Sequence, residues 1–281
     1  MNARANALLA LAAVIALPLA ANGDPLSLFQ PTQIRAVSVT PADMKAVHAL
    51  PPLEAFGTIR GTRVPGVDEV ASADEAAQDA GFALRLPASV PASVGKDVHY
   101  QVTQRARTSF TFSQAKAAGW AREHKVALRP LPSGLNGATY TATVRPIALV
   151  TYGTLPKGRQ SHRGPRHDVF LAIVQAPLPT VTSSGATLQA LTDWFGSQPG
   201  IPPRLLAQIK ALGDPAQTLP IPVRFNEQTA SKIDVDGAQG LAIGDETGIG
   251  SAIVWTKNGR LFAVAGTLPQ STILALANNL K

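Results

Sequence analysis

The densest group of charged side chains is a basic segment at residues 157–167, with the sequence KGRQSHRGPRH. It contains two histidines, no acidic residue, and the cations Lys157, Arg159, Arg163 and Arg166. Guanidinium and ammonium groups gathered in this way bind carboxylates, phosphates and other anions. The same composition is ordinary for a solvated loop between two strands. The segment therefore predicts either a contact site for an anionic partner or a solvated connection.

One pair of residues has the spacing of a known catalytic motif. Ser113 precedes Lys116 by three positions, as in penicillin-recognising enzymes, where the lysine lies beside a nucleophilic serine. The Ser-Asp-Asn and Lys-Thr-Gly motifs of such enzymes are absent from the sequence, and no Gly-x-Ser-x-Gly elbow marks a nucleophile. Serine is also a preferred residue immediately before a helix. We therefore interpret Ser113 as a helix cap and predict no catalytic residue.

Acidic residues gather in the C-terminal part of the chain. Asp234 and Asp236 alternate before a glycine, and Asp245 and Glu246 follow a few residues later. Calcium needs several carboxylate oxygens that converge on one point, but this spacing fits no EF-hand loop. Asp-Gly and Gly-Asp steps are also common turn residues between strands. In the basic segment, neighbouring cations oppose metal binding by the two histidines. We predict turns here, with no metal site and no cofactor.

The composition restricts the classes of protein to consider. The 281 residues include no cysteine, which excludes disulfides, thiolate nucleophiles and cysteine-containing zinc sites. Apolar residues make up 45% and aromatic residues 5%, so we expect an aliphatic core. We expect its aromatic anchors to include Trp120, Trp194 and Trp255, with stacking on a ligand as the alternative. The net charge of +7 suits lipid headgroups or acidic wall polymers, and we predict no nucleic-acid partner.

The N-terminus carries the clearest targeting signal. Residues 5–23 are uncharged and mostly Ala, Leu, Val and Ile, between Arg4 and Asp24. An apolar run of about 20 residues is long enough to span a bilayer. It also has features of a secretory signal, because Ala21 and Gly23 place small residues where a signal peptidase cleaves. We predict an extracytoplasmic chain that this segment holds in the membrane, or a secreted chain if the segment is cleaved.

Caps and turn residues predict the elements of the first half. Thr40-Pro41 and Ser72-x-x-Glu75 have the composition of helix starts, and Gly81 that of a helix end. Ser113 begins a further helix to about residue 123. Alternation of β-branched and aromatic residues predicts strands at residues 34–39, 97–103, 108–112, 139–152 and 168–175. The basic segment would then form the tip of a long hairpin or a longer crossing connection.

The second half begins after residues 176–185, APLPTVTSSG, which we interpret as a linker. Helices are expected at residues 187–195 and 202–212, each followed by glycine. Alternation predicts strands at residues 219–225, 232–235, 240–243, 252–255 and 261–265. Asn258-Gly259 is a specific hairpin signal. Thr267-x-x-Gln270 has the spacing of a capping box and predicts the start of the last helix.

The C-terminal block also resembles a known family. Residues 237–280 read GAQGLAIGDETGIGSAIVWTKNGRLFAVAGTLPQSTILALANNL. Together with the helix and proline-bounded segment at 73–91, they resemble an uncharacterised bacterial extracytoplasmic domain family, a domain of unknown function often attached to anti-sigma-factor-like membrane proteins. The resemblance lies in hydrophobicity and turns, and it implies an α+β fold outside the membrane. Such relatives carry a cytoplasmic zinc-binding module before the membrane helix, and this chain has only Met1 to Arg4 there and no cysteine. We therefore expect any role in such a pathway to involve another membrane protein.

These observations combine into one expected organisation. We predict an α+β fold with antiparallel sheets and short packed helices, preceded by an N-terminal apolar export or anchor helix. Residues 1–23 would be the signal peptide or membrane anchor, 24–66 a connecting segment, 67–176 a first α+β half, 177–186 a linker and 187–281 a second α+β half.

The expected function is a non-enzymatic binding or sensing domain at the bacterial cell envelope. Its partner would be an anionic envelope component or a membrane signalling protein, contacted through the basic segment. The alternative is an envelope hydrolase or carbohydrate-active enzyme whose site is assembled from residues distant in sequence. A deep pocket with a perturbed acid or base would indicate that alternative.

Overall fold

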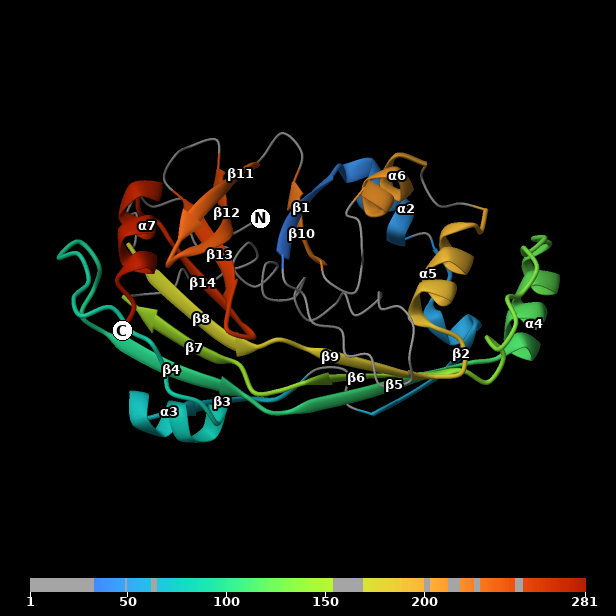
Figure 1. Ribbon diagram of the computed structural model, residues 1–281, viewed down its shortest axis with the longest axis horizontal. Helices are drawn as coiled ribbons and strands as arrows, with labels where there is room; N and C mark the ends of the chain where they lie inside the picture. Colours follow the sequence, from blue (N-terminus) through green and yellow to red (C-terminus); the bar gives the residue numbers. More distant parts are fainter. Residues whose placement is uncertain are drawn as a thin grey trace, which may run out of the picture.

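The structure, a computed structural model, describes residues 33–48, 50–61, 65–153, 169–199, 203–211, 218–224, 228–245 and 250–281 (Figure 1). The helices are α2 (Pro41–His48), the single-turn η1 (Leu53–Ala55), α3 (Ala73–Ala80), α4 (Gln114–His124), α5 (Leu188–Gly196), α6 (Pro203–Ala211) and α7 (Gln270–Asn278). The strands are β1 (Gln33–Val39), β2 (Gly57–Gly61), β3 (Val67–Val70), β4 (Val98–Thr103), β5 (Ala106–Phe112), β6 (Thr139–Val144), β7 (Ala148–Tyr152), β8 (Leu171–Pro177), β9 (Thr180–Ser184), β10 (Thr218–Arg224), β11 (Gln228–Val235), β12 (Ala238–Asp245), β13 (Ser251–Lys257) and β14 (Arg260–Gly266).

The strands form three sheets. The largest has eight strands in the order β11-β12-β13-β14-β8-β7-β4-β3, and the second has four in the order β2-β5-β6-β9. All neighbours in these two sheets are antiparallel, whereas β1 and β10 form a parallel pair. The predicted mixture of mostly antiparallel sheets and short helices is therefore confirmed. The predicted apolar helix at residues 5–23 lies outside the described residues. Within the described ranges, no helix is long and apolar enough to cross a membrane.

Three long, bent stretches of chain join the two antiparallel sheets. β4 leads into β5, β6 into β7 and β8 into β9, so each stretch contributes one strand to each sheet (Figure 1). Proline lies at two of the bends, as Pro146 between β6 and β7 and as Pro179 between β8 and β9. Because proline cannot donate a hydrogen bond to a neighbouring strand, it interrupts the ladder where one sheet ends and the other begins.

The main hydrophobic core lies on one side of this double sheet. Its side chains from the four-stranded sheet and α5 include Phe110, Phe112, Tyr140, Val181, Leu188, Leu191 and Trp194. It continues onto the eight-stranded sheet through Leu241, Val254 and Leu261, and the β1-β10 pair contributes Leu219, Ile221 and Val223. One core therefore contains residues from both expected halves of the chain.

On the opposite side, the described helices cover the eight-stranded sheet and leave the four-stranded sheet uncovered (Figure 1). α7 packs there in a cluster with Trp255, Phe262 and Val150, and α3 packs in a cluster with Val102 and Ala148. The segment at residues 82–91 crosses the same side, where Gln175 exchanges hydrogen bonds of 3.0 and 2.7 Å with the backbone of Arg85. In Figure 1, no described helix lies beneath β5, β6 and β9. The outward side chains of these three strands and of β2 are all exposed or half-buried.

Several local signals in the sequence are confirmed. The Ser72 hydroxyl caps α3 by accepting a 3.2 Å hydrogen bond from the backbone N–H of Glu75, and Gly81 ends the helix at a φ of 75°. Asn258 and Gly259 both have positive φ and join β13 to β14 as a hairpin. Such a turn matches the twist of the two strands and favours Asn-Gly.

Three local expectations differ from the structure. The expected single strand at 139–152 is divided into β6 and β7, because Pro146 lies between them. The expected linker at 177–186 contains the end of β8 and all of β9, and its Leu178 and Val181 are buried in the main core. Thr267 does not cap α7, which begins after Pro269. The Thr267 hydroxyl instead accepts a 3.1 Å hydrogen bond from the backbone N–H of Phe170.

Candidate functional site

The predicted contact residues of the basic segment lie outside the described residues. They are Lys157, Arg159, Arg163 and Arg166. The strands on each side are described, and β7 and β8 are antiparallel neighbours with Tyr152 opposite Leu171. The segment therefore connects two antiparallel neighbouring strands, which is the hairpin of the two alternatives that we expected. Its contact with an anionic partner stays a prediction.

Ser113 and Lys116 position a helix. The Ser113 hydroxyl caps α4 by accepting a 3.3 Å hydrogen bond from the backbone N–H of Lys116. The Lys116 ammonium group donates a 2.8 Å hydrogen bond to the carbonyl oxygen of Gly57, the first residue of β2. The pair therefore ties α4 to the edge of the four-stranded sheet, and the predicted cap is confirmed.

Asp236 belongs to an ion cluster that holds distant parts of the chain together. It lies in the turn between β11 and β12, and its carboxylate accepts from Arg85 at 2.5 Å and from Lys257 at 3.0 Å. The hydrogen bond from Arg85, together with that from Lys257, holds the pKa of the Asp236 carboxyl below its usual value. Glu246 lies outside the described residues. In the part of the chain that is described, no group of three or more His, Asp or Glu residues is placed to hold a metal ion.

Two of the three tryptophans are fully packed core residues. Trp194 and Trp255 are 3% and 0% exposed, which confirms the predicted role as anchors. Trp120 is half-buried at the edge of the main core and stacks on His124, with ring centroids 4.5 Å apart.

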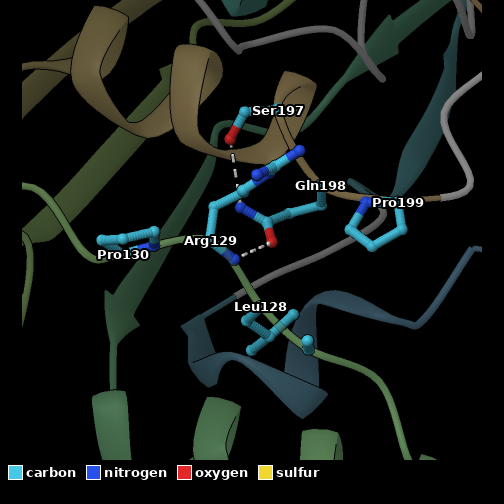
Figure 2. Close-up of a pocket in the computed structure, with 7 residues that line it drawn as sticks. Leu128, Arg129, Pro130, Ser197, Gln198 and Pro199 are labelled. Atoms are coloured by element: carbon cyan, nitrogen blue, oxygen red, sulfur yellow. Dashed lines mark hydrogen bonds between the residues drawn. The ribbon is translucent and has the colours of Figure 1, made fainter.

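A hollow of about 600 Å³ lies between the segment after α4 and the end of α5 (Figure 2). Gln198 spans it, because its amide oxygen accepts a 3.0 Å hydrogen bond from the backbone N–H of Arg129 and its amide nitrogen donates to the Ser197 hydroxyl at 3.2 Å. The described lining residues include no carboxylate or imidazole, the groups that most often transfer protons in catalysis. The Ser197 hydroxyl and the Gln198 amide nitrogen also donate to the carbonyl oxygen of Trp194, each at 2.7 Å, so these side chains stabilise the junction.

The outward face of the four-stranded sheet carries only Thr, Ser and Arg side chains, and we call it the hydroxyl face. Its members are Thr58 and Arg60 on β2, Arg107, Ser109 and Thr111 on β5, Thr139, Thr141 and Thr143 on β6, and Thr180, Thr182 and Ser184 on β9. The strand register aligns these residues in rows across the sheet, so that Arg60, Ser109, Thr141 and Thr182 form one row. In the neighbouring row, the Thr111 and Thr139 hydroxyls are hydrogen-bonded at 2.8 Å.

Arg60 and Arg107 give this face its charge. Arg60 lies opposite Ser109 on the neighbouring strand, so Arg107 is its diagonal neighbour, at a Cα distance of about 7–8 Å. Both arginines are exposed, and neither forms a hydrogen bond or ion pair within the described residues. The outward positions of these described strands include no Asp or Glu. The positive charge of this corner is therefore uncompensated on the face itself.

We did not predict the hydroxyl face from the sequence, although part of its pattern is visible there. Residues 139–143 read TYTAT and residues 180–184 read TVTSS, so Thr or Ser stands at every second position. A period of two predicts a half-buried strand with one polar side. It does not reveal that the polar sides of four strands meet on one surface, because that depends on strand order and register.

Comparison of the chain with protein-family models, with curated proteins and with solved structures finds no match. The resemblance to an extracytoplasmic domain family therefore stays a prediction.

Proposed function

We propose that this chain is a non-enzymatic binding domain at the bacterial cell envelope, held outside the cytoplasm by its N-terminal apolar segment. The observation that carries the proposal is the hydroxyl face. It is the outward side of a four-stranded sheet, and no described helix packs on it (Figure 1). The same side of the adjoining eight-stranded sheet is covered by α3 and α7.

The change of residue type along the bent strands supports the proposal. β4 places Tyr100 and Val102 against the covering helices, whereas β5, directly after it, places Arg107 and Ser109 outward. The four-stranded sheet, whose outward side no described helix covers (Figure 1), therefore carries polar side chains there that are suited to water or to a polar ligand. Apolar residues there would have required a further covering element.

The kind of polar residue on this face favours binding over simple solvation. A solvated surface generally carries interspersed acidic and basic residues, but this face combines hydroxyls with two arginines that have no hydrogen-bond or ion-pair partner among the described residues. Ser and Thr are short and lose less side-chain entropy on binding than Lys or Glu. Each hydroxyl both donates and accepts hydrogen bonds. Such a surface can bind a polar partner without large rearrangement.

The location is supported by residues 5–23, which have the length and composition of an export signal or anchor. It is tested by fusing alkaline phosphatase, which is active only outside the cytoplasm, to the C-terminus of the chain. We expect active fusions from the full chain and inactive ones after deletion of residues 2–23. Equal inactivity of both, with equal amounts of fusion protein, would contradict the location.

The binding role is tested by crosslinking the tagged full chain in cells. We expect capture of an acidic polymer or a membrane signalling protein, and weaker capture by the variant with Lys157→Ser, Arg159→Ser, Arg163→Ser and Arg166→Ser. If this variant captures the same material in the same amount, the basic segment is a solvated connection and binding has to involve another surface. If neither form captures anything, the proposed binding role is wrong.

A further inference from the structure

We infer that the hydroxyl face binds an acidic polysaccharide, with Arg60 and Arg107 holding a carboxylate and the Thr and Ser rows holding sugar hydroxyls. The inference rests on the proposed binding function, and it names the surface and the chemical class of the ligand.

The charge of the face indicates an anionic occupant. Arg60 and Arg107 are exposed diagonal neighbours without a described partner, and the surrounding outward residues carry no negative charge. A guanidinium group presents several N–H donors in one plane and binds a carboxylate through two parallel hydrogen bonds. The occupant therefore supplies the negative charge that the sheet lacks.

The spacing of the hydroxyls favours a polymer with many polar groups. Neighbouring strands lie about 4.8 Å apart, so the rows of this sheet extend for about 14 Å across its strands. Along each strand, successive outward residues follow at about 6.7 Å. Sugar hydroxyls are donors and acceptors, like the Thr and Ser side chains that they would meet. A polysaccharide can use this array repeatedly, whereas a small anion would use only the arginine corner.

The residue types of the face disfavour the other anionic partners. Membrane-binding surfaces generally add apolar side chains that enter the lipid boundary, and surfaces for single-stranded nucleic acid generally add aromatic side chains on which bases stack. The centre of a protein interface is generally built on aromatic or aliphatic anchors. Among the described strands of this sheet, no outward position carries an aromatic or large aliphatic residue. A hydrophilic acidic polymer is the partner that this surface matches.

The test measures binding of the full chain, purified in detergent, to polygalacturonate. Dextran serves as the neutral polysaccharide, and phosphatidylglycerol vesicles serve as a non-carbohydrate anionic surface. Two variants address the face. Arg60→Gln/Arg107→Gln removes its charge, and Thr141→Val removes a central hydroxyl while keeping the shape and the β-branched character. The control is Lys96→Gln/Lys232→Gln, which removes the same charge from exposed positions elsewhere.

We expect the wild type to bind polygalacturonate more tightly than dextran, and the binding to weaken as salt rises. The arginine variant should bind at least about tenfold more weakly and Thr141→Val about threefold more weakly, because charge-assisted hydrogen bonds contribute more than neutral ones. The lysine control should bind within about twofold of the wild type, since exposed charges distant from a ligand are screened. Thermal unfolding of each variant checks that the fold is retained.

Three results would overturn the inference. If the face variants bind polygalacturonate as the wild type does, the polymer contacts another surface, and the proposed binding function stands. If the chain binds vesicles through the arginines but no polysaccharide, the ligand class is wrong. If the lysine control loses affinity as much as the arginine variant, net charge explains the binding and the hydroxyl face does not.

Discussion

The ion cluster at Asp236 offers a direct test of how the C-terminal part of the fold is held. Asp236 and Arg85 are 151 residues apart in sequence, and Arg85 also donates to the carbonyl oxygen of Leu280. Lys257, at the end of β13, completes the cluster. We predict that Asp236→Asn lowers the free energy of unfolding. Asn suits the perturbation because it tolerates the positive φ of this position, 51°, and differs from Asp mainly in charge.

The expected loss is about 2 kcal/mol, between about 0.5 kcal/mol for an exposed ion pair and about 3–5 kcal/mol for removal of one partner of a buried pair. We choose an intermediate value because the carboxylate is nearly buried while its two cationic partners are partly exposed. The Asp236 side chain is 11% exposed, whereas the side chains of Arg85 and Lys257 are 30% and 34% exposed. Water can therefore solvate the two cations when the carboxylate is removed, and the full penalty of a buried unpaired charge does not arise.

The assay is urea unfolding followed by tryptophan fluorescence, at pH 7 and at lower pH. The pKa of Asp236 is lowered in the folded state. Its contribution is therefore present above the unfolded pKa of about 3.9 and is lost as the pH falls below that value. The difference between wild type and Asp236→Asn should shrink as the pH falls through this window. Asp234→Asn is the matched control, because Asp234 is an exposed carboxylate two positions away, and we expect a change within about 0.5 kcal/mol.

Two results would refute this reasoning. Equal stability of Asp236→Asn and wild type at pH 7 would mean that the ion pairs contribute nothing beyond the solvation they replace. A difference that stays constant down to the lowest pH would mean that the loss comes from packing or backbone geometry and not from charge.

The remaining predictions concern the core, a helix end and a buried tyrosine. Trp194→Ala should cost about 3–5 kcal/mol in urea unfolding, because Trp194 is 3% exposed and packs on Phe residues; the half-buried Trp120→Ala should cost clearly less. Gly81→Ala should cost about 1 kcal/mol through its φ of 75° alone, since a Cβ there meets nothing within 4 Å. Gly119→Ala, within α4 and equally free of contacts, should stabilise by about 0.5–1 kcal/mol. Burial raises the pKa of Tyr140 to about 12, so a titration followed by phenolate absorbance should show this tyrosine ionising at a higher pH than an exposed tyrosine. The stability that the neutral Tyr140 phenol contributes should be complete below pH 10 and lost as the pH rises toward 12. Tyr140→Phe should therefore lose less free energy of unfolding than the wild type over this pH range.

Local features were predictable because they depend on residues a few positions apart. The hydroxyl of Ser72 reaches the N–H three residues ahead, and Asn258-Gly259 forms its turn through its own backbone preferences. Strand segments were also predictable from their period of two, although Pro146 shows that one apparent strand can serve two sheets. Thr267 shows the limit of such reasoning, since its hydroxyl bonds to Phe170 in place of its own helix.

The sequence by itself thus determined the kinds and approximate positions of most elements, but it did not predict the strands β2, β3 and β9. Only the tertiary structure decided that β2, β5, β6 and β9 are neighbours and that their polar sides meet on one face. It also brought Arg85 to Asp236 and divided three stretches of chain between two sheets. Strand order and register follow from the packing of side chains across the whole chain, so contacts between distant residues are not encoded in any local pattern.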